Sequence, residues 1–308
     1  MSFFSVVIPL YNKEHFIENT LKSVLNQTFS DFELIIVNDG STDASEEKIF
    51  QFKDSRIHYY KKENAGVSAA RNYGIEKAKS NHITFIDADD YWYPDFLEEM
   101  FKNIHLYPEL KVFSAAIEVE TVNKTFPASY SIVKSGDCEI VNYFSASIKE
   151  TAICTSCAVF HKSVFEETGN FDIELKNTED IDMWIRIGLV YPVLFSWKIL
   201  AKYVYDNSSL SKKTELSIQK INFEKFNEQE KTNPDLKLFL DLNRFSLAIK
   251  CKIAGNQTLF DAYYKAIDLK KLSHKKQILL LTPAVLLKFL IQLKRFLTEI
   301  GLGSSVFK

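Results

Sequence analysis

The sequence predicts an α/β fold, in which a mostly parallel sheet is flanked by helices and followed by a helical C-terminal extension. Over the first hundred residues, short apolar runs rich in β-branched side chains alternate with stretches of helical periodicity, the pattern of repeated βα units. Beyond Asn207 no clear strand pattern follows, and amphipathic helical patterns dominate. The 308 residues, 46% hydrophobic and 25% charged, suffice for two globular domains or for one domain with an appendage.

The predicted elements follow one another in a regular order. Strands are expected at residues 4–9, 32–37, 56–60 and 82–86, and helices at 15–25, from Asp43 onward, and at 66–78. A helix at 94–107, a strand at 110–120, a helix at 179–190 and an extended segment at 193–205 come next, whereas the pattern between 121 and 160 is mixed. Ligands of such sheets bind beyond the carboxyl ends of the strands, where Asn12, Asp39 and Asp87 are expected to lie.

A short acidic run, Asp87-Ala88-Asp89-Asp90, follows the fourth predicted strand directly. Three carboxylates within four residues repel one another and are costly to place near an apolar core. A divalent cation removes this conflict, and Mg²⁺ commonly combines one or two protein carboxylates with the phosphates of a substrate. The run therefore predicts a metal site that holds a diphosphate. The alternative is a solvated acidic turn that caps the next helix.

Six motifs occur in order along the chain. They are SVVIPLYN at 5–12, SVLNQT at 23–28, ELIIVNDGSTD at 33–43, GVSAARN at 66–72, IDADD at 86–90 and TEDIDMW at 178–184. This series closely resembles glycosyltransferase family 2, the inverting sugar transferases with the GT-A fold, over about residues 4–205. The resemblance implies a catalytic domain at 1–208, with a donor half at about 1–118 and an acceptor half at 119–208. A basic, helical region would follow at 209–308.

The resemblance implies a nucleotide-sugar donor that is held by residues after the first two strands. Pro9, Tyr11 and Asn12 belong to this expected donor site, and Tyr11 offers an aromatic face to the nucleobase. Asp39 can accept a hydrogen bond from the imide N–H of uracil or thymine; the structural alternative, an Asx turn of Asp39 with Gly40, is compatible with that role. Family members often carry a second Asp where this chain has Asn38, which keeps an acceptor but loses the charge.

By the same resemblance, Asp87 and Asp89 form the family's D-x-D. Asp89 is the expected direct ligand of Mg²⁺ or Mn²⁺, and Asp87, with Ala88 beside it, is expected at the ribose or in the metal shell. Asp90 is expected to cap the following helix. Arg71 is expected to contact the nucleotide or its phosphates, the alternative being an ordinary salt bridge to a nearby carboxylate.

Inversion at the anomeric carbon needs a general base on the face opposite the leaving group. Glu179-Asp180 resembles the family's E-D pair, which makes Asp180 the expected base and Glu179 a supporting or acceptor-binding residue. The alternative is that both simply open a helix at its positive end. Trp184 is expected to pack. His161 is a further candidate metal ligand or acceptor contact, with an ordinary surface histidine as the alternative.

The motif after the expected base bears on the kind of transfer. The processive synthases of this family carry Q-x-x-R-W there, but this chain has Trp184-Ile185-Arg186, and no transmembrane bundle is expected. We therefore expect a single sugar to move from a UDP-sugar, or another nucleoside-diphosphate sugar, to a hydroxyl of a glycan or lipid-linked glycan in bacterial surface polysaccharide synthesis. A degenerate member that only binds is the alternative. A nucleotidyltransferase is disfavoured because residues 11–14 contain no glycine.

Charge is distributed unevenly along the chain. Residues 1–208 carry 20 Lys+Arg and 31 Asp+Glu, a net charge of −11, and residues 209–308 carry 18 and 9, a net charge of +9. Within 270–300, Lys288, Gln292, Arg295 and Glu299 recur at helical spacing beside a wide apolar face. Such a helix lies on an anionic membrane or packs against the catalytic domain or a second subunit. No recognition motif accompanies the charge, so no nucleic-acid partner is expected.

The four cysteines fit a reducing cytosol. Cys154 and Cys157 form a lone C-x-x-C without a second pair of ligands, so buried free thiols are expected rather than a metal or redox site. The N-terminal residues include no basic region and no long apolar segment, so no signal peptide is expected. The expected location is the cytoplasm, with peripheral contact at the inner face of the cell membrane as one role of residues 270–300.

Overall fold

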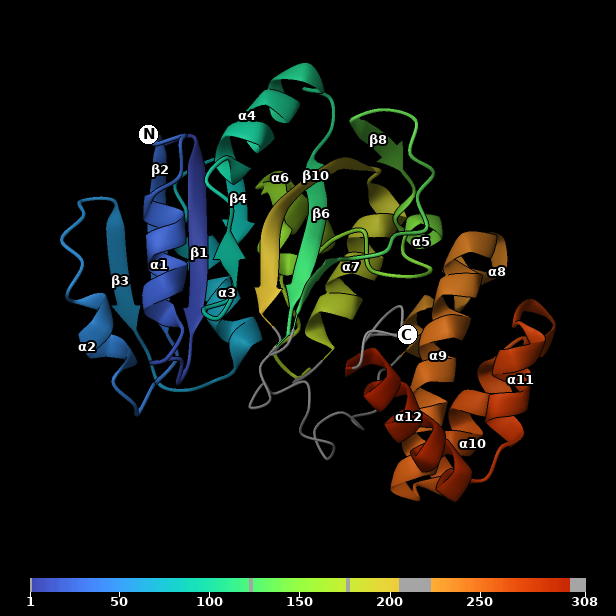
Figure 1. Ribbon diagram of the computed structural model, residues 1–308. Coiled ribbons are helices and arrows are strands. Elements are labelled where there is room, and N and C mark those ends of the chain that lie inside the picture. The colour runs from blue at the N-terminus through green and yellow to red at the C-terminus, as the bar shows by residue number, and fades with distance from the viewer. Residues whose placement is uncertain (1, 122–123, 176–177, 205–222, 300–308) are drawn as a thin grey trace. The chain divides into compact units, whose positions relative to one another are not determined.

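The computed structural model describes residues 2–121, 124–175, 178–204 and 223–299, with the side chains of 294–299 excluded (Figure 1). The chain divides into two compact units. The sheet unit comprises Met1–Ala128, Ile132–Tyr143 and Thr151–Asn207. The helical unit comprises Ser129–Ser131, Phe144–Glu150 and Ser208–Lys308. The boundary predicted near residue 208 lies outside the described residues, and the division into donor and acceptor halves stays a prediction.

The sheet unit is built on one mixed sheet. Its first half consists of parallel strands in the order β3-β2-β1-β4, with bounds Ile57–Lys61, Phe32–Asn38, Phe4–Leu10 and His82–Phe85. The order continues with β9 (Ala158–His161), β6 (Val112–Glu120), β10 (Val193–Val204) and β5 (Tyr91–Trp92). β6 and β10 run parallel to each other, while β9 and β5 are antiparallel to their neighbours, as are β7 (Thr125–Pro127) and β8 (Cys138–Val141). The predicted α/β class is confirmed.

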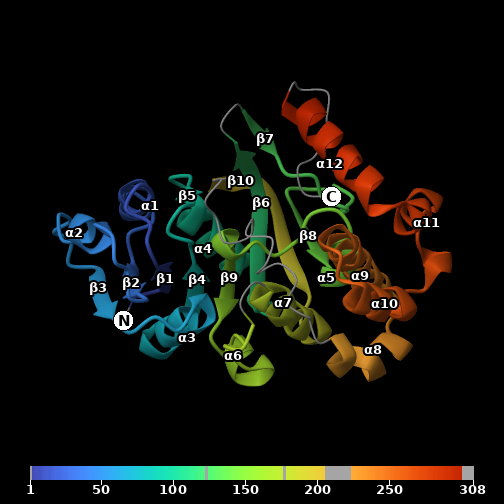
Figure 2. The same cartoon turned by 90° about the horizontal axis from the view of Figure 1, so that it is seen from below.

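Helices cover both faces of this sheet (Figure 2). One face carries α1 (Ile17–Leu25), α2 (Ser45–Ile49) and α4 (Phe96–Leu106). The other carries α3 (Val67–Lys77), α6 (Ser163–Thr168) and α7 (Glu179–Val190). Two short helical elements, α5 (Tyr143–Ala146) and η1 (Thr155–Cys157), lie in the segment whose pattern was mixed. The fully buried strands β1 and β2 explain why their sequences are continuous apolar runs, since a parallel sheet is covered on both faces.

Helix α3 packs unusually close to strand β1, and a glycine makes this possible. A Cβ built on Gly74 would lie 2.3 Å from Cγ1 of Val7, closer than any real contact. The helix begins after Gly66, whose φ of +90° is readily adopted only by glycine. Arg71, one turn before Gly74, is thereby held near the carboxyl ends of the strands.

The helical unit contains, in its described part, no strand. Its elements are η4 (Phe223–Phe226), α8 (Asn227–Thr232), α9 (Pro234–Ala254), α10 (Gln257–Ala266), η5 (Leu269–Lys271), α11 (His274–Leu281) and α12 (Ala284–Glu299). The longest helix, α9, has well-defined ends: the Asn233 side chain accepts the N–H of Leu236, Pro234 follows, and Gly255 ends the helix with φ +78°. The predicted helical extension is confirmed. None of the helices in the described ranges is long and apolar enough to cross a membrane.

Candidate active site at the carboxyl ends of the strands

The loops after β1 and β2 are joined at the carboxyl edge of the sheet. The two strands are parallel and in register, with Leu10 opposite Asn38. Asn12 donates its backbone N–H to Oγ of Ser41 (3.0 Å), and its Oδ1 accepts the N–H of Thr42 (2.8 Å). Asn12 has φ +51°, a conformation that Asn tolerates better than most residues. The prediction that the loops after β1 and β2 lie at the same edge of the sheet is therefore confirmed.

Tyr11 and Asp39 occupy different environments at this edge. Tyr11 is 43% exposed, so its ring is open to a stacking partner, while Pro9 is buried within β1. Asp39 is buried, and its carboxylate accepts the N–H groups of Ala65 (3.0 Å) and Gly66 (2.8 Å) and an ion pair from Lys62. Asp39 thus holds the loop that leads into α3, and its contact with a nucleobase stays a prediction.

Asn38, not Asp39, closes the turn after β2. Oδ1 of Asn38 accepts the N–H of Ser41 (2.8 Å), so the alternative of an Asx turn formed by Asp39 is wrong. The Nδ2 of Asn38 donates to the Tyr59 hydroxyl (2.7 Å), which donates to Glu46 (2.8 Å). An Asp at position 38 has no N–H to donate, so this hydrogen bond to Tyr59 needs the amide that the chain carries there.

Arg71 connects two of the expected site carboxylates. Its Nη2 donates to Oδ1 of Asp87 (2.8 Å) and its Nη1 to Oε1 of Glu179 (3.0 Å). The side chain is buried, with the guanidinium 5.4 Å from the ring centroid of Phe171. Burial opposes the charge, but Asp87 and Glu179 outweigh it, so the pKa of Arg71 lies above its ordinary value. The salt-bridge alternative is observed, and the nucleotide contact of Arg71 stays a prediction.

Asn72, next to Arg71 on α3, binds the backbone of Phe171, which lies between α6 and α7. Its Nδ2 donates to the carbonyl of Phe171 (2.8 Å), and its Oδ1 accepts the N–H of Phe171 (2.9 Å). Sequence reasoning missed this role, although Asn72 ends the GVSAARN motif. The reciprocal pair positions Phe171 under the guanidinium.

Asp89 forms an ion pair with Lys13, which sequence reasoning also missed. Burial raises the pKa of Asp89, Lys13 opposes this, and Asp87 adds to it. The pairing could have been expected, because Lys13 follows β1 at the edge where the acidic run follows the adjacent β4. Lys13 thus supplies a positive charge at the place where a metal ion is expected.

Asp90 has a structural role that differs from the predicted one. Its Oδ2 accepts the hydroxyl of Ser156 (2.5 Å), and its Oδ1 accepts the N–H of Val204 (3.0 Å). Helix α4 begins at Phe96, after Asp95, so the prediction that Asp90 caps this helix is wrong. Burial, followed by Asp89 and Asp87, raises the pKa of Asp90 well above its usual range. Asp90 therefore links the acidic run to η1 and β10.

Two carboxylates remain for a divalent metal. The side chains of Asp87 and Asp89 keep 33% and 16% of their surface exposed, and Ala88 between them is buried. Oxygen ligands of this kind suit Mg²⁺ or Mn²⁺ when the substrate's phosphates complete the shell. In the parts of the chain that the structure describes, no group of three or more His, Cys, Asp or Glu side chains forms a metal site. A divalent ion held by this pair would therefore need further oxygen ligands, such as the phosphates of a substrate.

His161 does not join this pair. It lies opposite His82, the first residue of β4, whereas Asp87 comes two residues after the end of β4, and five residues of extended chain span about 16 Å. The prediction that His161 is a ligand of the same metal ion is therefore wrong. Burial, followed by the nearby Lys111, lowers the pKa of His161, and its Nδ1 lies 3.0 Å from the Ser163 hydroxyl.

Asp180 lies at the start of α7, beside Glu179. Burial and the charge of Glu179 raise its pKa to about 7, against the effects of the Ile181 N–H and of Arg71. A carboxylate with this pKa is poised to take a proton near neutral pH. Further along α7, Trp184 is buried and stacks on Phe160 at 5.2 Å, so the predicted packing role of Trp184 is confirmed.

The C-x-x-C motif lies at η1, and Cys154 is close to Asp90. Cys154 and Cys157 are free, and burial raises the pKa of both thiols above the ordinary value. Nearby carboxylates, Asp90 among them, act in the same direction. Thiols in such surroundings are unreactive, which agrees with the predicted free thiols.

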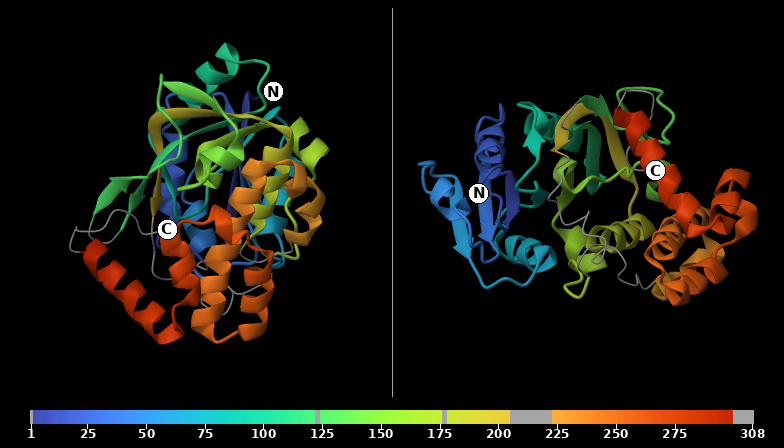
Figure 3. Two further views of the ribbon diagram at one scale, coloured as in Figure 1. Left: turned by 90° about the vertical axis from the view of Figure 1, so that its right-hand side faces the viewer. Right: turned by 60° about the horizontal axis from the view of Figure 1, so that its bottom comes forward.

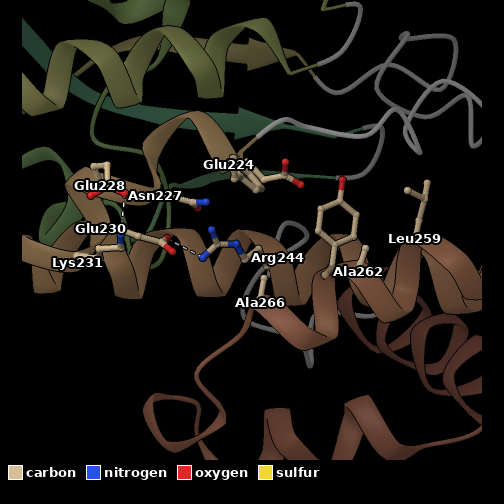
Figure 4. A pocket seen from close by; sticks show the side chains of 11 residues that line it. Glu224, Asn227, Glu228, Glu230, Lys231, Arg244, Leu259, Ala262 and Ala266 are labelled. Atoms are coloured by element: carbon tan, nitrogen blue, oxygen red, sulfur yellow. Dashed lines mark hydrogen bonds and ion pairs between the residues drawn. The ribbon is translucent and has the colours of Figure 1, made fainter.

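A cavity of about 430 Å³ lies in the helical unit and contains none of the predicted site residues (Figure 4). Its charged lining includes Glu224, Glu228 and Glu230, and the guanidinium of Arg244 is already bound by Glu230 (2.8 Å) and Asp241 (3.3 Å). Because its cations are paired and acidic groups border it, this cavity does not suit a diphosphate.

Comparison with known proteins agrees with this geometry. Residues 5–169 match glycosyl transferase family 2. The chain is 45% identical to glycosyltransferase GlyA of Streptococcus pneumoniae over 105 residues, which cover 33% of this chain and 15% of GlyA. It is 28% identical to an uncharacterized glycosyltransferase of Rickettsia bellii over 253 residues, which cover 78% of this chain and 36% of that protein. The chain thus spans well under half of these relatives.

A solved structure extends the likeness beyond the family match. The crystal structure of S. aureus TarS 1–349 in complex with UDP-GlcNAc superposes with a TM-score of 0.61 at 17% identity, covering 87% of this chain and 93% of that one. At this identity the likeness concerns the fold, which is the expected GT-A type. Since the family match covers more than half of the 308 residues and includes the D-x-D at the sheet edge, the chain belongs to glycosyl transferase family 2.

Proposed function

We propose that this protein is a metal-dependent, inverting glycosyltransferase that uses a UDP-sugar as donor. The single observation that carries the proposal is the arrangement of Arg71, which binds both Asp87 of the D-x-D and Glu179 of the E-D pair. One buried side chain thus joins the expected donor-binding and base-bearing elements. The UDP-GlcNAc bound by TarS supports a UDP-sugar and, more specifically, a hexosyl-type donor.

On the donor side, Tyr11 would stack on the base and Asp39 would accept the imide N–H. Asp89 and Asp87 would hold Mg²⁺ or Mn²⁺, which when bound offsets negative charge on the departing nucleoside diphosphate. Lys13, paired with Asp89, offers an ammonium group to the same phosphates. The exposed ring of Tyr11 and the partly exposed side chain of Asp87 support this assignment.

On the acceptor side, Asp180 would accept the proton of the attacking hydroxyl. A base with a pKa of about 7 is half ionised at neutral pH and still strong enough to take the proton as the oxygen attacks the anomeric carbon. Glu179 is ion-paired with Arg71, and this contact keeps the start of α7 in place. The single displacement inverts the configuration at that carbon.

The proposal also names the class of acceptor. A single-sugar transfer to a glycan or lipid-linked glycan hydroxyl, in bacterial surface polysaccharide synthesis, is supported by the absence of the processive Q-x-x-R-W motif and by the bacterial origin of the relatives. The intact carboxylates argue against a degenerate member that only binds.

A nucleotide-sugar screen tests the donor. Thermal unfolding is measured with UDP-, GDP- and TDP-sugars, each with and without Mn²⁺, because a ligand that binds only the folded state raises the midpoint. We expect a UDP-sugar to protect in the presence of metal, and Asp89→Ala to abolish the metal-dependent part. Equal protection by all nucleotides, or protection that ignores metal, would contradict the proposal. Tight UDP binding without turnover over a broad acceptor panel would favour the binding-only alternative.

A further inference from the structure

A group of large apolar side chains lies exposed on the last two described helices. They belong to α11 and α12 and are between 38% and 82% exposed: Ile278, Leu281, Val285, Leu286, Phe289, Leu290 and Leu293. On α12 the spacing of i, i+1, i+4, i+5 and i+8 places them along one side of the helix. We call this group the α11–α12 apolar face.

The opposite side of the same helices is packed. Leu280 of α11 and Leu287 of α12 are almost fully buried, and both helices contact α9. Figure 3 shows α11 and α12 following α9 and α10 within the helical unit. The exposed residues therefore lie on the sides of α11 and α12 that face away from α9. An exposed apolar patch of this size is typical of an interaction surface.

Basic residues accompany the apolar face. Residues 270–308 contain eight Lys or Arg and a single acidic residue, Glu299. Of these, Lys270, Lys271, Lys275 and Lys288 are exposed. A surface that combines exposed apolar side chains with a large excess of positive charge is complementary to a surface that combines acyl chains with anionic headgroups.

We propose that the α11–α12 apolar face docks on an anionic lipid surface and lies within its headgroup region. A 16-residue helix such as α12 is about 24 Å long, shorter than the roughly 30 Å hydrocarbon core. Lying in the plane of the interface lets the apolar side chains reach the acyl boundary while the lysines stay at the headgroups. The binding does not depend on glycosyl transfer.

Two other occupants fit the observations less well. A second copy docked face to face would bring two lysine-rich borders together, which repel. Within the described residues of the sheet unit, the large exposed apolar side chains are dispersed over separate elements, as with Phe50 after α2, Leu106 at the end of α4 and Val190 at the end of α7. Dispersed single residues do not offer the continuous apolar surface that seven side chains require, whereas a bilayer does.

Vesicle co-sedimentation of the full-length chain tests the proposal. The probes are vesicles of phosphatidylglycerol with phosphatidylcholine, and of phosphatidylcholine alone. The double variant Val285→Ser with Phe289→Ser removes two exposed side chains, so folding is retained. The triple variant Lys270→Gln, Lys271→Gln and Lys275→Gln removes charge. Matched controls are Leu106→Ser for the apolar change and Lys231→Gln with Lys265→Gln for the charge change.

We expect binding to the anionic vesicles only, weakened by salt. The serine variant should lose binding, each neutralised lysine should weaken it by about five-fold at low salt, and both controls should bind as the wild type does. Asp180→Asn should bind vesicles normally, which separates this proposal from the catalytic one. Equal binding of all variants, or no vesicle binding, would overturn the proposal. A dimer in sedimentation that the serine variant abolishes would overturn it in favour of a second copy.

Discussion

The Nη1 atom of Arg71 lies 3.0 Å from Oε1 of Glu179, a buried ion pair that joins α3 to the first turn of α7. The same guanidinium binds Asp87 at 2.8 Å. Because the guanidinium fork is planar and rigid, the two carboxylates are held at a fixed separation. Arg71 is therefore a positioning residue that fixes the distance between Asp87 of the D-x-D and Glu179 of the E-D pair.

Removing this cation should be costly for stability. Arg71→Met leaves Asp87 and Glu179 without their shared partner, and breaking a buried pair in this way costs about 3–5 kcal/mol. Urea unfolding measures the change. Lys22→Gln, which breaks the exposed pair with Glu18, serves as the control and should leave the free energy of unfolding almost unchanged. If both variants lose a similarly small free energy of unfolding, the Arg71 ion pairs do not stabilise the fold.

The pH profile of transfer should report Asp180. Because its pKa is raised to about 7, kcat/KM should rise with pH up to about pH 7 and fall roughly tenfold per unit below it. Asp180→Asn should lose activity at every pH. A profile that is flat between pH 5 and pH 8 would contradict the assignment of Asp180 as the base.

The same group should make stability depend on pH. A carboxyl whose pKa is higher in the folded protein than the ordinary 3.8 favours folding when protonated, so its contribution is lost as pH rises through about 7. Asp180→Asn imitates the protonated form. This variant should melt at a higher temperature than the wild type at pH 8 and at the same temperature at pH 4, whereas Asp31→Asn, an exposed control, should show no such difference.

Lys13 should compete with the metal ion for Asp89. In Lys13→Gln the competing ammonium is absent, so Mn²⁺ should bind more tightly, by about five-fold if the partly buried ion pair contributes about 1 kcal/mol. The affinity for UDP should fall, because a positive charge near the phosphates is lost. Isothermal titration of each ligand separates the two effects, and unchanged affinities for both would exclude Lys13 from the site.

The contact between α3 and β1 should not tolerate a methyl group. Gly74→Ala places a Cβ against Val7, and overpacking of this kind costs about 1–3 kcal/mol, against about 1 kcal/mol gained in helix propensity. Gly136→Ala, whose added Cβ would meet its nearest neighbour at 3.7 Å, is the control. The double variant with Val7→Ala should be less destabilised than the sum of the single changes. Simple additivity would show that no clash occurs.

The sequence anticipated those features that depend on local pattern. The βα alternation located β1 to β4 within one or two residues, and parallel order placed the loops of Asn12, Asp39 and Asp87 at one edge. The features it missed depend on side chains that are distant in sequence. Asp90 reaches Ser156 and Val204 instead of α4, and no local pattern reveals such partners.

The error about His161 has a similar origin. His161 was a candidate by residue type, but β9 runs antiparallel to β4 and carries His161 to the end of the sheet opposite the acidic run. Strand direction is a property of the whole sheet and is set by packing between segments far apart in the chain. The Lys13–Asp89 pair was predictable from parallel order, because both follow adjacent strands.

Metal-dependent sugar transfer is tested by the release of UDP from a UDP-sugar with an acceptor glycan, measured with and without Mn²⁺ for the wild type, Asp89→Ala and Asp180→Asn. We expect turnover by the wild type only when Mn²⁺ is present. Asp180→Asn should lose at least about a hundred-fold in rate, the usual contribution of a general base. Asp89→Ala should lose the metal dependence together with the activity. Full activity in either variant would contradict the proposed transfer mechanism.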